Sequence, residues 1–143
     1  MSYITKKNTV LKALEDIELR QIFEVTNETT EGVLIQAEQN MGNGKCVISL
    51  QLENRAFNGI YFSLGRLSNL GKKDNMLDLL NSFNEENLML KFYINENNSI
   101  MAHVMYIATD KNFSAEEYVS LIGPAFTTLE KDFYGKIMRV MWA

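Results

Sequence analysis

The sequence predicts an α+β fold in which an antiparallel sheet of about five strands carries helices packed on it, in the order α-βββ-α-ββ-α. Two observations lead to this class: apolar residues recur at helical spacing in three parts of the chain, and the segments between them alternate apolar with polar residues. The 143 residues form one domain, 1–143, because a chain of this length buries about two thirds of its unfolded surface.

The first predicted element is a helix over residues 6–19. Val10, Leu11, Leu14 and Ile17 recur at intervals of three and four, and charged residues stand between them. This is the spacing that places apolar side chains on one face of a helix.

A group of extended segments follows the first helix. In the best of them Cys46, Ile48, Leu50 and Leu52 share one face of a strand, and the residues between them, Val47, Ser49 and Gln51, share the other. Asn43-Gly44 and Asn58-Gly59 are pairs typical of tight hairpin turns. We therefore expect a three-strand meander. Four segments look extended, residues 22–25, 32–38, 46–52 and 60–64, and three strands are expected from them.

A second helix is predicted over residues 72–83, ended by Asn84, and a hairpin of residues 88–95 and 99–108 follows. A three-residue turn between these strands puts four apolar cross-strand pairs on one side. The cross-strand pairs expected in this register are Ile94 with Ile100, Phe92 with Ala102, Leu90 with Val104 and Leu88 with Tyr106.

The last third of the chain is predicted to be helical. Residues 114–117, Ser-Ala-Glu-Glu, match a capping box, which predicts a helix start. Gly123-Pro124 is expected to kink or restart the helix. Beyond the proline, apolar residues from Phe126 to Val140 repeat at three and four and predict a long tail helix with one buried stripe.

Composition excludes several classes of function. With 14 Lys and Arg against 18 Asp and Glu, the net charge of −4 does not suit nucleic-acid binding. One Cys and one His assemble neither a disulfide nor a His/Cys zinc site. We expect no metal, no cofactor and no catalytic residue. The chain has no apolar run of membrane-spanning length and no signal peptide, which predicts a cytoplasmic protein without membrane contact.

The order of elements, with Leu80-Asn81 leading into the run from Leu90 to Val104, resembles the YbjN-like family of bacterial proteins, which is similar in fold to type III secretion chaperones. The resemblance covers residues 8–138. It implies an antiparallel sheet with helices packed over it, frequent homodimers, and a role in protein binding or regulation without chemistry. The partner's identity does not follow from it.

The face of the second hairpin opposite its apolar stripe has an unusual composition for a strand surface. Flexible thioethers beside aromatic rings suit an adaptable protein-binding surface. Two interpretations stay open: the helix over 72–83 covers this face within the chain, or a partner or second copy does. Its residues are Met89, Lys91, Tyr93, Met101, His103 and Met105.

Three further residues carry individual expectations. His103, the only imidazole, is expected as a half-buried polar tip and not as a general base, because no nucleophile motif stands near it. Cys46 is expected as a small buried apolar side chain. Trp142 is expected to dock onto the core, with a dimer or partner contact as the alternative.

Together these features predict a non-enzymatic protein-binding or regulatory module. An immunity-type inhibitor of a toxin is the first alternative, with acidic residues at 28–31 and 85–86 steering it to a basic target. A small-molecule-responsive domain is another. An enzyme using Glu or Asp would require a deep pocket around a carboxyl with a perturbed pKa.

Overall fold

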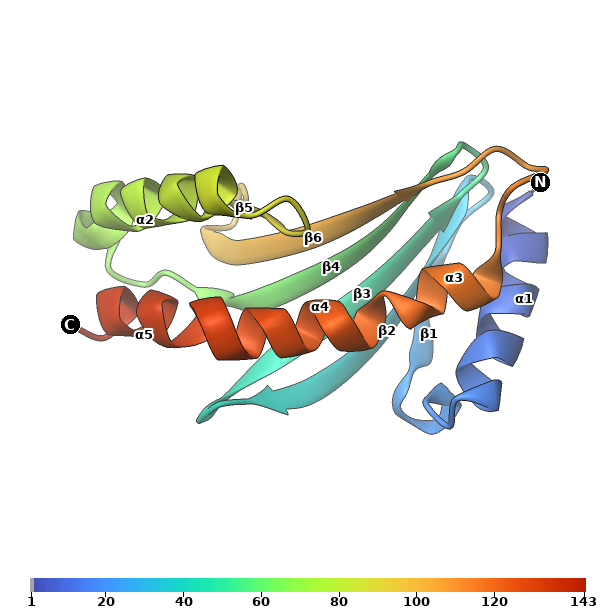
Figure 1. The fold of residues 1–143 in the computed structure, drawn as a ribbon, viewed down its shortest axis with the longest axis horizontal. Coiled ribbons are helices and arrows are strands. Elements are labelled where there is room, and N and C mark those ends of the chain that lie inside the picture. Colours follow the sequence, from blue (N-terminus) through green and yellow to red (C-terminus); the bar gives the residue numbers. More distant parts are fainter. Residues whose placement is uncertain (1) are drawn as a thin grey trace.

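The computed structural model describes residues 2–143, which form one six-stranded antiparallel sheet with helices (Figure 1). The strand order across the sheet is β1-β2-β3-β4-β6-β5. The strands are β1 (Glu24–Glu28), β2 (Gly32–Met41), β3 (Gly44–Glu53), β4 (Phe57–Arg66), β5 (Lys91–Ile94) and β6 (Ser99–Ile107). The helices are α1 (Tyr3–Asp16), α2 (Lys73–Glu86), α3 (Ala115–Ser120), α4 (Ile122–Thr128) and α5 (Gly135–Met141), with short 3-10 turns at Arg20–Ile22 and Leu70–Lys72.

The α+β class is confirmed, with six strands where about five were expected. The additional strand is β1, which extends the segment expected at 22–25 through polar residues and pairs with β2. All five of its residues are exposed. An edge strand of this kind needs no apolar face, so its sequence gave only a weak strand pattern.

The long hairpin β2–β3 follows the predicted alternation, and Cys46, Ile48, Leu50 and Leu52 are all buried. Asn58-Gly59, however, is not a turn. Both residues lie inside β4, where the buried Asn58 amide donates to the carbonyls of Ala56 and Tyr106, each at 3.2 Å. These bonds explain why a turn-forming residue is kept within a strand.

The second hairpin has the predicted register, but its first strand is shorter than expected. Phe92 pairs with Ala102 and Ile94 with Ile100, as predicted. The pairs of Leu90 and Leu88 with β6 do not form, because the Asn87 side chain holds a turn in which its Oδ1 accepts from the Leu90 N–H at 2.7 Å. Leu88 is consequently fully exposed.

Helix α2 runs through the predicted stop at Asn84 and ends two residues later, at Glu86. Instead of capping the helix, Asn84 pairs with the backbone of β5: its Nδ2 donates to the Phe92 carbonyl at 3.0 Å and its Oδ1 accepts from the Phe92 N–H at 2.8 Å. The amide therefore takes the place of a neighbouring strand along β5.

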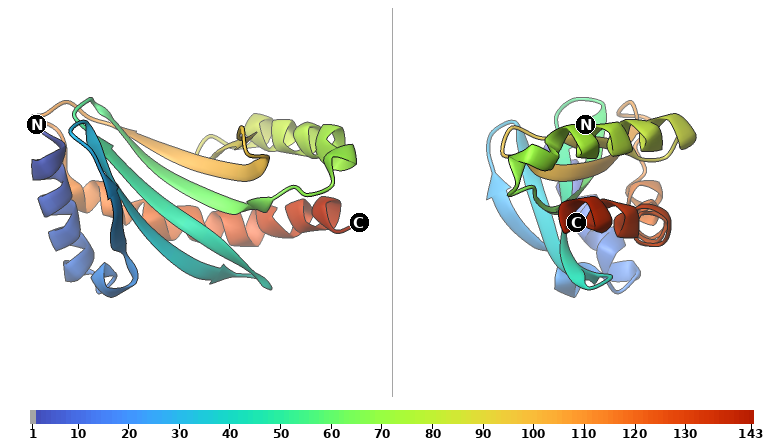
Figure 2. Two further views of the ribbon diagram at one scale, coloured as in Figure 1. Left: turned by 180° about the vertical axis from the view of Figure 1, so that it is seen from behind. Right: turned by 90° about the vertical axis from the view of Figure 1, so that its left-hand side faces the viewer.

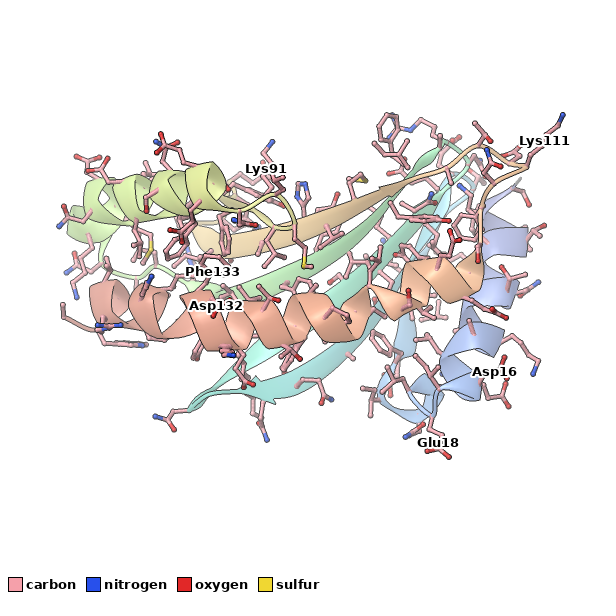
Figure 3. All side chains as sticks on the ribbon, in the orientation of Figure 1. Asp16, Glu18, Lys91, Lys111, Asp132 and Phe133 are labelled. Atoms are coloured by element: carbon pink, nitrogen blue, oxygen red, sulfur yellow. The ribbon has the colours of Figure 1, made fainter. Side chains whose placement is uncertain are left out.

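The helices lie on one face of the sheet. The segment α3–α5 runs along this face, α1 stands at one end and α2 at the other (Figures 1 and 2). The helix breaks at Leu121, just before Gly123-Pro124, as predicted. Between α4 and α5 a π-helical turn, Leu129–Tyr134, buries the consecutive residues Phe133 and Tyr134, and Figure 3 shows Phe133 on the α2 side of the helix.

One charged residue is buried where α1 meets the end of the β3–β4 hairpin. The Lys6 ammonium donates to the carbonyls of Glu53 and Arg55 and to Oδ1 of Asn58, at 2.8, 2.6 and 3.0 Å. Burial lowers its pKa, and the charges of Asp110 and Glu53 oppose that shift. Because all three donors are used, Lys6 fixes α1 to the sheet.

Candidate functional site

The face of the sheet opposite the helices is open: no helix within residues 2–143 crosses it (Figure 2, left). The interpretation in which the middle helix covers this face is wrong. Helix α2 packs on the other side, where the Phe83 ring lies 5.1 Å from that of Phe92 and 4.7 Å from that of Phe133. The half-buried side chains of the open face are Leu34, Gln36, Val47, Ser49, Gln51, Tyr61, Ser63, Tyr93, Met101, His103 and Met105.

The open face has two chemically different halves. On β2 and β3 the amides are hydrogen-bonded to neighbours: Gln36 Nε2 donates to Ser49 Oγ at 2.8 Å, and Gln51 Nε2 to a Glu53 carboxylate oxygen at 2.9 Å. The polar groups of this half are thus satisfied by neighbours, and Leu34 and Val47 lie beside them. The half on β4, β5 and β6 carries Tyr61, Tyr93, Met101, His103 and Met105, which we call the Met-Tyr-His patch.

His103 stands at the centre of this patch between two tyrosines. The imidazole lies edge-on to Tyr61 at 5.3 Å and to Tyr93 at 5.6 Å between ring centroids. The register explains the cluster, since His103 pairs with Tyr61 across β4–β6, and Tyr93 pairs with Met101 across β5–β6. Such edge-on contacts are favourable and hold the three rings in place.

The protonation states of the patch are set mainly by burial. Burial lowers the pKa of His103, with a further lowering by the Lys91 charge, and it raises the pKa of both Tyr61 and Tyr93. The three rings are therefore neutral at physiological pH. The buried Nδ1 of His103 has no hydrogen-bond partner within residues 2–143.

The sequence placed Tyr93, Met101, His103 and Met105 correctly on one face but missed Tyr61. The alternation of Tyr61 with the buried Ile60 and Phe62 did place it on the face opposite the core. The sequence did not show that β4 pairs with β6, which is what brings Tyr61 beside His103. Gly59 belongs to the same site. A Cβ there would lie 2.3 Å from the Tyr61 ring, so the glycine leaves space for that ring to lie on the strand.

The other two candidates, Met89 and Trp142, lie outside the strands that form the patch. Met89 is 45% exposed in the turn before β5. Docking of Trp142 onto the core is wrong, because this side chain is 73% exposed. The last helix ends at the buried Met141, and the following residue points away from the core, while Lys72 Nζ hydrogen-bonds the carbonyls of Met141 and Ala143.

Trp142 lines a separate groove of about 770 Å³ between the last helix and the β2–β3 turn. The turn is held there by Glu130, whose carboxylate accepts from the Gly42 N–H at 2.9 Å. Gly42 and Gly44 pack directly on the Tyr134 ring. Its lining mixes the apolar Met138 and Trp142 with the charged Lys45, Arg66 and Glu130.

Elsewhere the titratable groups have structural roles. Cys46 is buried as expected, and burial raises the pKa of its thiol to about 12. Hydrogen bonds from Lys7 and Tyr3 lower the pKa of Glu28. Within residues 2–143 no cluster of three or more His, Cys, Asp or Glu is arranged to hold a metal ion, and none of the helices is both long and apolar enough to span a membrane.

Comparison with known proteins identifies the family. Residues 9–134 match the YbjN family, described as a putative bacterial sensory transduction regulator. Comparisons with curated proteins and with solved structures find no significant match, so the likeness in fold to type III secretion chaperones stays a prediction. The match covers most of the chain, including every strand of the sheet and helix α2. The resemblance expected from the sequence is thereby confirmed, and the chain belongs to the YbjN family.

Proposed function

We propose that this chain is a non-enzymatic cytoplasmic regulator that acts by binding a protein partner on the Met-Tyr-His patch. The observation that carries the proposal is the position of this patch on the side of the sheet that no helix of residues 2–143 covers. The family's description as a regulator supports the class of function.

The chemistry of the patch supports a protein as its ligand. Tyrosine and methionine are enriched at the centres of protein interfaces, where the rigid tyrosine ring supplies contact area at a small entropic cost and the flexible methionine adapts to the partner's shape. The hydrogen-bonded amides of the β2–β3 half would form the wet rim of such an interface.

The test compares affinity capture by the wild type with capture by two single variants. Met101→Glu places a charge in the centre of the patch, and Thr127→Glu adds the same charge at an exposed position of α4, on the helical side. The binary complex would then be reconstituted from the purified partner. We expect Met101→Glu to weaken binding about 100-fold, as burial of an unpaired charge requires, and Thr127→Glu to leave it unchanged.

Light scattering on the same three proteins identifies the kind of partner. A wild-type dimer that Met101→Glu dissociates would make a second copy of this chain the occupant of the patch. If Met101→Glu and Tyr93→Ala both fold while neither changes any partner interaction or the oligomeric state, the proposal is wrong.

A further inference from the structure

We infer that the outer edge of β6, beyond the end of β5, is a docking site for an extended segment of a partner protein, which adds to the sheet as a seventh strand. The segment would be apolar at alternate positions and would carry carboxylates at its ends. The inference rests on the proposed function and specifies the kind of partner that the Met-Tyr-His patch serves.

The free edge arises because β5 is too short for β6. Strand β6 runs from Ser99 to Ile107, whereas β5 pairs only with its residues 100–103. At the hairpin turn the Asn95 N–H donates to the Ser99 carbonyl at 3.0 Å, so odd-numbered residues of β6 direct their backbone groups toward β5. Met105 and Ile107 do the same, and no backbone group within residues 2–143 pairs with them on that side.

The chain protects its other strand edges. Along β5, the Asn84 side chain occupies both backbone groups of Phe92. Strand β1, at the opposite edge, has a bulge between Val25 and Asn27 and a glutamate at each end. Bulges, charges and covering side chains are the usual defences against unwanted strand pairing. Within residues 2–143 the edge at Met105 and Ile107 has neither a bulge nor a side chain bonded to its outward backbone groups, so these groups are open to pairing.

The surroundings of the free edge are apolar. Ile107 is 64% exposed and pairs across the sheet with Phe57, which is 51% exposed. Leu88, in the turn that leaves β5, is fully exposed. Because side chains alternate along an added strand, every second residue of the partner would lie beside Met105 and Ile107 and enlarge the open face.

Lysines stand at both ends of this edge. Lys91 pairs with His103 at the last residue covered by β5, and Lys111 lies in the loop after β6 (Figure 3). The acidic residue of that loop, Asp110, interacts electrostatically with Lys6. Two exposed lysines favour a partner segment with carboxylates at its ends.

The same charges argue against a second copy as the occupant. If two copies paired antiparallel along this edge about a twofold axis, the Lys91 end of one would face the Lys111 end of the other. Like charges placed opposite each other destabilise such a pair. A different protein is therefore the occupant that the charges fit.

The experiment selects peptides from a random 12-residue library displayed on phage, using the immobilised full chain as bait. Selected peptides are then measured on Ile107→Pro, which removes one outward N–H, and on Ile107→Val, which keeps it. A proline is tolerated where the N–H points off a sheet edge, and the bond from Ala108 N–H to the Ala56 carbonyl remains. We expect peptides with alternating apolar residues and terminal acids, bound about tenfold more weakly by Ile107→Pro and equally well by Ile107→Val.

Hydrogen exchange on the wild type provides a readout that does not depend on a variant folding. The amides of Met105 and Ile107 should exchange more slowly once a selected peptide is bound. Binding that Met101→Glu abolishes but Ile107→Pro leaves intact would overturn the edge site and keep the proposed function. Failure to select any peptide, or a dimer that Ile107→Pro dissociates, would also overturn the edge site. Peptide binding insensitive to both variants would contradict both proposals.

Discussion

The two faces of the sheet are made by the same strands, yet only one is covered. Along β4, the buried Ile60, Phe62 and Leu64 meet the helices, while Tyr61 and Ser63 between them face the open side. Along β6, Ala102 and Val104 are buried and the neighbouring His103 and Met105 are half-buried.

The difference teaches that alternation identifies the core face but does not say whether the other face meets water or a partner. On β2 and β3 the open side chains include Gln36, Ser49 and Gln51, which are hydrogen-bonded as water-facing residues should be, beside two aliphatic residues. On β4 to β6 they are aromatic rings and thioethers beside an imidazole. Burying a strand surface of that composition against a protein is more favourable in free energy than leaving it in water.

The largest expected contrast between the faces is in thiol reactivity. Cys46 lies on the covered face, and raising its pKa from 9.0 to about 12 lowers its thiolate fraction about a thousandfold at pH 8. Ser63→Cys adds a second thiol on the open face of β4. With excess Ellman's reagent, we expect the wild type to show no fast-reacting thiol and the variant to show one.

The native Cys46 serves as the internal control, because both thiols are in one molecule. Unfolding in guanidinium should make both react at similar rates. A slow Ser63→Cys thiol at high protein concentration that becomes fast on dilution would show that a second copy covers the open face.

Stability should differ between neighbouring aromatic residues of β4. Phe62→Ala empties a fully buried site on the covered face, and a loss of about 4 kcal/mol is expected. Tyr61→Ala removes a half-buried ring from the open face, and about 1 kcal/mol is expected. Urea unfolding of both variants measures the two losses, with Phe62→Leu as a milder substitution. Equal losses would mean that the open face contributes to the core as much as the covered one.

The sequence was sufficient for features determined by local pattern. The alternation in residues 46–52 and the register of Phe92 with Ala102 followed from periodicity and turn length, and both are observed. The restart of the last helix followed from one proline. These features need no knowledge of distant parts of the chain, which is why they could be predicted.

Features determined by distant contacts could not be predicted in this way. Asn84 continues α2 because its amide finds the backbone of Phe92, and Asn58 stays within β4 because Lys6 and Tyr106 satisfy its side chain. Tyr61 joins the candidate site only through the pairing of β4 with β6. In each case a polar or aromatic residue has its partner on another helix or strand, and periodicity within one element carries no information about such contacts.

The smallest expected effect concerns the pKa of His103, which tests whether the neighbouring tyrosine rings shield this imidazole from water. Burial and the nearby Lys91 lower its pKa in the folded chain below the ordinary value of 6.5. As the chain has one histidine, its imidazole resonance can be followed by NMR without ambiguity. We expect a midpoint below 6.5 and a higher midpoint in Lys91→Ala, because that change removes a repulsive charge.

A lowered pKa means that the unfolded chain binds more protons than the folded chain below about pH 6.5. The wild type should therefore lose stability relative to His103→Gln as the pH falls from about 7.5 through 6.5 toward the folded pKa, and the difference should level off below that pKa. Water screens the half-buried ring, so the loss should stay under about 1 kcal/mol. A His103 titration midpoint at or above 6.5, or a wild type that gains stability on acidification, would contradict this expectation. Either result would mean that water solvates the imidazole and that the Met-Tyr-His patch is not shielded from solvent.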